Sequence, residues 1–525
     1  MAKSQGRRFT LQERSWIMYD WANSVYATNI MAAIFPIVFG TMARTAGVKG
    51  DQLLSYGVSI ATGVVALMAP ILGAVADFKG MKKKLFTAFW LLGVVATALI
   101  ALTNDYRVML AGYVLSRIGF SGSTLFYDSF LTDVTTNERM DKVSTWGYAM
   151  GYIGGSTIPF LVSIGVLLAL DYSPFAQKFS ILITSIWWFV FTIPFLKNVH
   201  QEHYIEHHEG FSVGGVFKNI GRTARDIVSN KGLMMFMLSY FFYIDGVGTI
   251  INISTAYGTA LGLNSTAMIL ALLVTQIVAM PCSILFGRLT QRITARRALL
   301  FAIAVYMIIC SVGFIMGYTL EPHQAAYDSA YEAHAALQAD TVGDTFADKQ
   351  AAREAIEDYL AAAKEPAATR NAKKLSALEL TLPEAAEADS ALLPAATQTL
   401  QAATQAFIDN NADVIDAQQN ARQFSSILFW AMAVLVGTVQ GGIQAVSRSF
   451  FGKLIPKHRS NEFFGFFDIF GKFASVLGPF LYAAVGSMTG RSSWGTLCLL
   501  ALFIIGFIIL YRAKAPLEQL TANAD

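Results

Sequence analysis

The chain has 525 residues, of which 54% are hydrophobic and only 14% are charged, and its formal net charge is +3. This balance is too apolar for a soluble protein of this length, so the composition predicts a membrane protein. No nucleotide-binding P-loop occurs, which argues against transport powered directly by ATP.

Apolar stretches long enough to cross roughly 30 Å of hydrocarbon recur along the chain. We predict twelve membrane-spanning helices and therefore an all-α membrane protein. The predicted spans are 16–42, 53–76, 85–103, 107–128, 144–169, 178–197, 232–257, 266–287, 298–319, 424–447, 463–487 and 492–512.

Basic residues in the loops predict the orientation, because Lys and Arg are retained on the cytoplasmic side. Placing the N-terminus inside puts most loop Lys and Arg in the cytoplasm. We therefore expect an inner (plasma) membrane protein with both termini cytoplasmic. The first span is too long and too polar around Tyr19–Ser24 for a cleaved signal peptide, so we read it as a retained helix.

Polar side chains form stripes on particular helices. A charge within hydrocarbon is costly, so each such residue needs a partner, water or a function. The candidate positions share helical spacing or mid-helix placement. As a substrate or ion pathway we select Asp20, Asn23, Arg117, Ser121, Thr124, Asp245, Thr249, Asn252, Gln440, Gln444, Asp468 and Lys472. Asp468 and Lys472, spaced i, i+4, could also simply neutralise one another.

Other polar or small residues lie at predicted cytoplasmic helix ends, where a gate is expected. We assign this role to Gly73, Asp77, Gly80, Asp128 and Arg448. Gly73 would let its helix approach a neighbour, and Asp77 could cap or pair with the end of another helix. Asp20 also lies near a cytoplasmic end, where gating fits better than substrate contact.

The chain contains an internal repeat. Residues 111–161 align with residues 431–481 without a gap at an offset of 320, with Gly, Pro and Arg among the matches. A weaker match at an offset of 214 pairs Gly73 with Gly287 and Lys82 with Arg296. The charges diverge: Asp128 aligns with Arg448 and Asp133 with Lys453. A parallel repeat in a membrane protein predicts two similar halves around a central site.

The two offsets differ by 106, which predicts an insertion of about that size in the second half. Residues 321–420 hold 17 acidic and 6 basic residues, so the inside-positive rule places the segment outside. Strong helix formers around 348–363 predict short helices, and 395–423 is expected to run into the tenth span as a stalk. The insertion is either a solvated ornament or a docking domain for a periplasmic protein partner.

These features divide the chain into six parts. They are a bundle of six helices at 1–198, a cytoplasmic linker at 199–230, helices at 231–319, the external insertion at 320–423, helices at 424–512 and a cytoplasmic tail at 513–525.

Several motifs resemble a known family. The run from Gly73 to Lys83 resembles the loop signature of the major facilitator superfamily, with Phe78 where that pattern has a basic residue. The stretches 19–36 and 441–473 are similar to the vacuole-effluxer-like family within it. The resemblance implies a fold in which helices 1, 4, 7 and 10 line a central cavity, and secondary transport, with amino-acid export known among fungal vacuolar members.

A mechanism follows as a hypothesis. Asp245 would bind a proton or the ammonium group of a small zwitterion, while Arg117 would hold a carboxylate or keep Asp245 responsive. The halves would then rock about the site and expose it alternately to the two sides. We therefore predict a secondary active transporter of a small solute, with an amino acid or related compound favoured and a proton as the coupling ion.

Two alternatives remain open at this stage. One is a transporter of a larger amphiphile such as a lipid, peptide or siderophore, and the other is a non-transporting receptor or scaffold that uses the insertion. No enzymatic set of side chains, cofactor site or nucleic-acid signature is expected. Cys282, Cys310 and Cys498 lie inside spans. His200, His203, His207 and His208 are read as a solvated linker rather than a metal site.

Overall fold

The computed structural model describes residues 8–46, 48, 50–170, 173–206, 213–261, 263, 265–343 and 409–522. Within these ranges the chain is all helical, apart from one isolated bridge between Phe78 and Ile205. Eleven helices in the described ranges are long and apolar enough to span a membrane. The predicted helix within 348–363 lies outside the described residues.

The twelfth predicted span is helix α6, Tyr106–Ser129. Its 24 residues give about 36 Å of helix, enough to cross the hydrocarbon. Glycines, serines and Arg117 lower its hydropathy below that of the other spans. The helix packs against α4 and α5, so neighbouring helices shelter its polar groups.

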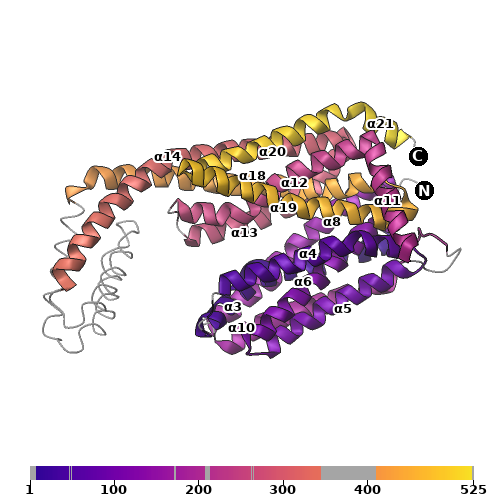
Figure 1. Ribbon diagram of the computed structural model, residues 1–525, viewed down its shortest axis with the longest axis horizontal. Helices are drawn as coiled ribbons and strands as arrows, with labels where there is room; N and C mark the ends of the chain where they lie inside the picture. The colour runs from indigo at the N-terminus through magenta and orange to yellow at the C-terminus, as the bar shows by residue number, and fades with distance from the viewer. Residues whose placement is uncertain are drawn as a thin grey trace.

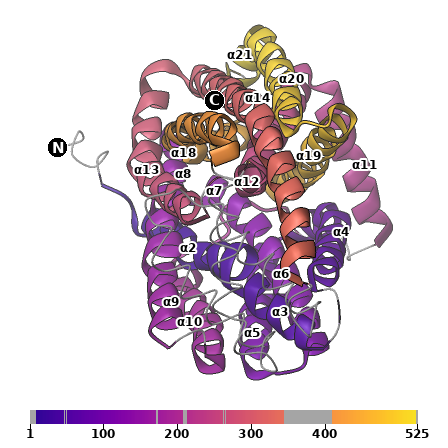
Figure 2. The ribbon, with the colours of Figure 1, turned by 90° about the vertical axis from the view of Figure 1, so that its left-hand side faces the viewer.

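The first half forms one bundle (Figures 1 and 2). Its helices are α2 (Leu11–Val25), η1 (Tyr26–Ala33), α3 (Ile34–Thr45), α4 (Gly50–Ala76), α5 (Met81–Leu102), α6, α7 (Leu131–Val134), α8 (Asn137–Gly151), η2 (Tyr152–Thr157), α9 (Ile158–Ala169) and α10 (Pro174–Asn198). The first and fifth predicted spans each contain a π-helical segment, η1 and η2, which the sequence analysis did not predict.

The linker helix α11 (Val213–Ser229) leads into the second half. That half comprises α12 (Lys231–Ala260), α13 (Ser265–Ile293), α14 (Ala295–Gly343), α18 (Ala412–Leu454), η4 (Lys457–Arg459), α19 (Ser460–Thr489), α20 (Ser492–Arg512) and α21 (Lys514–Ala522). Figure 1 shows the two halves lying close at the end that carries both termini, which we call the terminus end, and diverging toward the opposite, insertion end.

The insertion is carried by two extended helices. Helix α14 continues without a break past the predicted limit of 319 to Gly343, and α18 begins at Ala412, before the predicted 424. The pair is held together by a hydrogen bond from Gln418 Nε2 to Gln324 Oε1 of 2.8 Å. The predicted stalk leading into the tenth span is confirmed over 412–423.

Close helix contacts within the halves depend on small residues. A Cβ built at Gly119 of α6 would lie 2.3 Å from the backbone nitrogen of Gly93 in α5. Such a contact requires the helices to separate, and overpacking of this kind costs about 1–3 kcal/mol or more. We predict that Gly119→Val lowers the thermal unfolding temperature of the purified protein.

The matched control is Gly165→Val in α9, because a Cβ there meets nothing within 4 Å. Its unfolding temperature should stay near that of the wild type. Equal losses in both variants would contradict the proposed role of the α5–α6 contact.

Candidate functional site: a charged gate between the halves

The halves meet through helices near the terminus end. Helix α4 of the first half packs against α19, while α8 packs against α13 and α18. The hydrogen bonds that join the two halves gather in this region. We call this set of contacts the gate, and it contains the predicted gating residues Gly73, Asp77, Asp128 and Arg448.

Arg448 of α18 is the charged centre of the gate. Its guanidinium donates to Asp128 Oδ1 of α6 at 2.8 Å and to Asp20 Oδ2 of α2 at 3.3 Å. It also donates to the hydroxyl of Ser144 at 3.0 Å and to the Ser144 carbonyl oxygen at 3.2 Å. The side chain is 4% exposed, so one buried cation from the second half is neutralised entirely by the first.

Aromatic rings complete the surroundings of this cation. The guanidinium carbon lies 4.7 Å from the ring centroids of Trp16 and Tyr148, and 5.3 Å from that of Tyr127. A cation over such ring faces is attracted by their quadrupoles, more strongly when water is excluded. A Cβ at Gly147 would lie 2.4 Å from Asp20 Oδ2, so this glycine is needed for the carboxylate to reach Arg448.

Two hydrogen bonds of the gate are related by the internal repeat. Ser129 donates to Asn461 Oδ1, and Ser449 donates to Asp141 Oδ1 at 2.6 Å. Adding 320 to 129 and to 141 gives 449 and 461, so each bond is the counterpart of the other with the halves exchanged. Asp128 and Arg448 are also 320 residues apart. Equivalent positions therefore meet across the boundary between the halves.

Asp77 caps a helix of the opposite half. Its carboxylate accepts hydrogen bonds from the backbone N–H groups of Asn461 and Glu462, at 2.9 and 3.0 Å, in the first turn of α19. The Asn461 amide also donates to it at 2.7 Å. A Cβ at Gly73 would lie 2.5 Å from the Asn461 carbonyl oxygen, so Gly73 permits this approach. The predicted capping geometry is confirmed.

A second buried ion pair fixes the loop behind Asp77. Lys82 Nζ lies 2.6 Å from Asp133 Oδ2, with both side chains fully buried, and it also donates to the hydroxyl of Ser460. Burial acts to raise the pKa of Asp133, but Lys82 and the hydrogen bonds from His203 outweigh it and hold the pKa below its usual value. Gly80, with φ of 73°, occupies the left-handed conformation that begins α5.

The predicted pathway residues on α6 face the interior but not Asp245. Arg117 is half-buried and donates to the hydroxyl of Tyr113 at 3.1 Å. Ser121 and Thr124 are half-buried, and the Thr124 hydroxyl donates to the carbonyl of Phe120. No contact between Arg117 and Asp245 occurs in the described part of the chain. Asp20, placed with the pathway by the sequence, lies in the gate, whereas Asn23 is buried on α2.

Asp245 and Thr249 lie on the buried face of α12, against α19. Their exposed fractions are 1% and 0%, and a Cβ at Gly478 would touch both side chains. Neither carboxylate oxygen of Asp245 nor the Thr249 hydroxyl has a hydrogen-bond partner among the described residues. Asn252, one turn further, is exposed. An unpartnered buried carboxyl is costly if ionised, which marks this site as unusual.

The remaining pathway candidates lie on α18 and α19. Gln444 is half-buried and donates to the carbonyl oxygen of the buried Gln440 at 3.2 Å. Asp468 and Lys472 form an ion pair within α19, as their i, i+4 spacing predicted. The structure thus leaves these four residues in local contacts on the second half.

Several gate residues were missed by the sequence analysis. Asn461, Asp141 and the Lys82–Asp133 pair all carry inter-half or supporting contacts. The 320-residue register contained a signal for the first two, because Asp141 and Asn461 are equivalent polar positions beside spans. Among the described residues no group of three metal-ligating side chains occurs, and His207 and His208 lie outside them.

Comparison with known proteins identifies the family. The profile of the Atg22-like vacuole effluxers matches residues 51–326 and 425–518, on either side of the insertion. The protein belongs to the Atg22-like vacuole effluxer family. An uncharacterized MFS-type transporter of Bacillus subtilis is 37% identical over 526 residues, covering 98% of this chain and 97% of the relative. The family and its fold are those of transporters, not enzymes.

More distant relatives agree with this assignment. Autophagy-related protein 22-1 of Neosartorya fischeri is 20% identical over 200 residues, covering 35% of this chain and 33% of the relative. Among solved structures, an outward-facing bacterial homologue of the iron transporter ferroportin matches with a TM-score of 0.58 at 10% identity, covering 96% and 98% of the two chains. The fucose:proton symporter of Escherichia coli has a TM-score of 0.57 at 10% identity, covering 96% and 97%. The family member therefore has the major facilitator fold.

Removing the Arg448 charge should open the gate. Truncating one member of a buried ion pair leaves its partners uncompensated and costs about 3–5 kcal/mol. In a background with the three native cysteines replaced by alanine, we predict that Arg448→Gln raises labelling of Met140→Cys by a water-soluble maleimide at least about tenfold. Met140 is fully buried between α8 and α18.

Arg512→Gln provides the matched control, because Arg512 is an exposed arginine at the same end of the molecule. It should leave labelling at position 140 unchanged. Unchanged labelling in Arg448→Gln as well would show that the ion pair does not hold the halves together.

The gate should respond to pH through Asp77. Burial raises the pKa of Asp77 to about 7, although Lys82 and the hydrogen bonds from Asn461 and Glu462 act in the opposite direction. In an open gate, water would return the pKa toward its ordinary value of about 4. The closed state then binds the extra proton, so lowering the pH between about 7 and 4 favours closure.

We predict that labelling of Met140→Cys, normalised to an exposed Lys514→Cys, is about tenfold slower at about pH 6 than at about pH 8. The normalisation removes the pH dependence of thiol reactivity. Asp77→Asn should abolish the difference. An unchanged pH dependence in that variant would assign the effect to another group.

Proposed function

We propose that the protein is a secondary active transporter that moves a small solute across the plasma membrane by alternating access. The observation that carries the proposal is the gate, in which equivalent positions of two repeated halves bond to each other at one end of the molecule. Such contacts can form at one end only while the halves diverge at the other. Breaking them lets the halves rock about a central site.

The basic loops support a cytoplasmic location for both termini in the inner (plasma) membrane. The gate would then be the cytoplasmic gate, and the structure would represent an outward-facing state. On the same argument the acidic segment 321–420 lies outside the cell or in the periplasm, where it could contact a protein partner. Its described ends, in α14 and α18, are consistent with an external stalk.

Asp245 is the best candidate for ion coupling. Its two carboxylate oxygens are buried without hydrogen-bond partners in this state, and the Thr249 hydroxyl beside it is also unpartnered. A proton or a bound cation would relieve the cost of an isolated buried charge. A carboxyl that is held neutral in one state and hydrated in the other couples proton movement to the change of state. We therefore propose proton coupling.

An amino acid or a related small zwitterion is the favoured substrate. The family name and the Autophagy-related protein 22 relatives support efflux of small molecules. On α6, Arg117 has a hydroxyl partner but no carboxylate partner among the described residues, so it could bind a substrate carboxylate. Its guanidinium is always charged and can grip a carboxylate with two parallel hydrogen bonds.

The test is counterflow in proteoliposomes. We expect exchange of a radiolabelled amino acid, identified by ligand-dependent thermal stabilisation, and stimulation of net uptake by a pH gradient. Asp245→Asn, which preserves shape and removes the titrating group, should retain counterflow but lose stimulation by the gradient.

Asp416→Asn is the matched control, since Asp416 is an exposed acid of the stalk in the same half. It should behave as the wild type. Full gradient-driven transport by Asp245→Asn would refute the coupling role, and absence of counterflow with every amino acid would refute the substrate class.

A further inference from the structure

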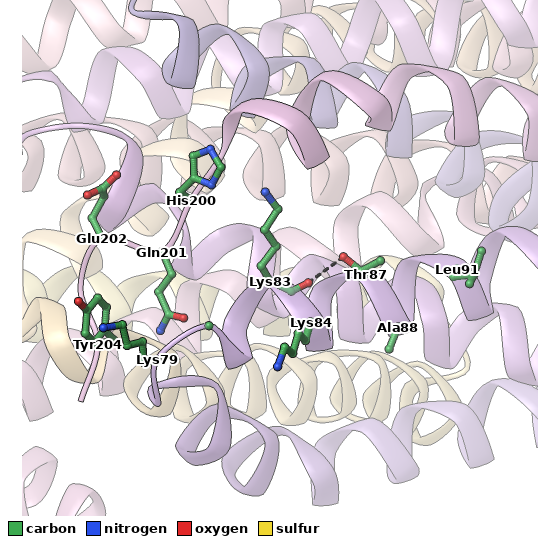
Figure 3. A pocket seen from close by; sticks show the side chains of 11 residues that line it. Lys79, Lys83, Lys84, Thr87, Ala88, Leu91, His200, Gln201, Glu202 and Tyr204 are labelled. Atoms are coloured by element: carbon green, nitrogen blue, oxygen red, sulfur yellow. Dashed lines mark hydrogen bonds between the residues drawn. The ribbon is translucent and has the colours of Figure 1, made fainter. Parts of the chain in front are cut away.

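A basic pocket of about 970 Å³ lies beside the start of α5, away from the gate itself. Figure 3 shows the side chains that line it, from α5 on one side and from the linker after α10 on the other. Its cationic groups are Lys79, Lys83, Lys84 and His200, while Glu202 is the one carboxylate among the lining residues. We propose that this pocket binds the phosphate head group of an anionic phospholipid.

The lysines of the pocket are available to a ligand. Lys83 Nζ donates to the carbonyl oxygen of Val199 at 2.8 Å, which leaves two of its three N–H donors. Lys79 Nζ lies 5.0 Å from the ring centroid of Tyr204, and Lys84 is exposed. None of the three forms an ion pair with a described residue. Lys82, by contrast, turns inward to Asp133 and contributes nothing to this surface.

The single acidic side chain is directed elsewhere. Glu202 Oε1 accepts a hydrogen bond from Gln12 Nε2 at 3.3 Å, and the backbone N–H of Glu202 is bound to Asp133. Three lysines against one carboxylate leave the pocket with an excess of positive charge. A buried or half-buried site with such an excess is complementary to a phosphate group.

The surface of α5 indicates that the phosphate belongs to a lipid. The pocket also includes Ala88 and Leu91, and beyond them an exposed apolar stripe continues along the helix. Its members recur at steps of three or four, so they lie on one face. They are Leu91, Val95, Leu99 and Leu102, which are 46%, 46%, 54% and 71% exposed.

Lys84 lies at one end of this same face. From Lys84 to Leu102 the helix rises about 27 Å, close to the thickness of the hydrocarbon layer. A lysine where the stripe ends is thus at the depth of the head groups, and Leu91 is about 10 Å deeper, beside the acyl chains. One phospholipid would satisfy both parts of the surface, whereas a free phosphate ion would use only the basic part.

The wall of the pocket is fixed to the gate. The linker residue Ile205 donates its N–H to the Asp77 carbonyl oxygen at 2.8 Å, and Lys79 donates back to the Ile205 carbonyl oxygen. Gln201 Nε2 donates to the Ala76 carbonyl oxygen at 3.0 Å. A lipid held between Lys83, Lys84 and His200 would therefore brace the loop that carries Asp77.

The test is a titration of the delipidated, full-length protein in a neutral detergent with long-chain phosphatidylglycerol, followed by native mass spectrometry. Each lysine near a phosphate contributes about fivefold to affinity. Lys79→Gln/Lys84→Gln should therefore weaken the first binding event about 25-fold. Lys84→Gln alone, which removes an exposed side chain and cannot disturb the core, should weaken it about fivefold.

The matched control is Lys514→Gln, which removes the same charge from an exposed lysine at the same end of the molecule. It should bind phosphatidylglycerol as the wild type does. Equal weakening in control and pocket variants would overturn the proposal in favour of diffuse surface attraction. Phosphatidylcholine should bind more weakly than phosphatidylglycerol to the wild type, and an equal affinity for the two lipids would also overturn it.

Two competitors distinguish the source of the anion. Inorganic phosphate and a short-chain, water-soluble phosphatidylglycerol should both compete poorly, because neither fills the apolar stripe. Efficient displacement by inorganic phosphate would identify a free-anion site instead. Displacement by an acidic peptide at lower concentration than the lipid would identify a protein-docking surface.

Discussion

The structure depends on a cation that its own half of the protein cannot neutralise. Arg448 is buried on α18, and both of its carboxylate partners, Asp20 and Asp128, come from the other half. Removing a guanidinium from water is affordable only with well-placed anions, so the two halves hold each other in place by a shared charge requirement. This makes the contact strong while it is dry and weak once water enters, which suits an interface that must open.

The rest of the gate is arranged so that this exchange is all or none. The Asp77 cap on α19, the Ser129–Asn461 and Ser449–Asp141 bonds and the close approaches at Gly73 and Gly147 all require the same relative position of the halves. Each is lost if the helices separate by a few tenths of an ångström. Packed interfaces with such geometry have discrete arrangements rather than a continuous range.

Much of this could be predicted from sequence. Hydropathy and loop charge predict the helices because lipid leaves few alternatives to them, and the repeat register placed Asp128 opposite Arg448, where the two now form an ion pair. The same register placed Asp133 opposite Lys453, yet Asp133 pairs with Lys82 and Lys453 with Asp141. An alignment relates positions by symmetry, but only residues near the axis of that symmetry can touch their counterparts. The π-helical segments η1 and η2 have no periodic signature either, because one extra residue per turn does not change which residue types are apolar.

Helix α18 gives the molecule a long rigid arm. It runs without interruption from Ala412, at the base of the insertion, to Leu454, just beyond Arg448. From Ala412 to Arg448 the axis measures about 54 Å. A tilt of about 10° around Arg448 would therefore carry the outer end sideways by about 9 Å. Small rotations that part the charged groups at one end become large excursions at the other, so the position of the insertion is a mechanical readout of the state of the gate.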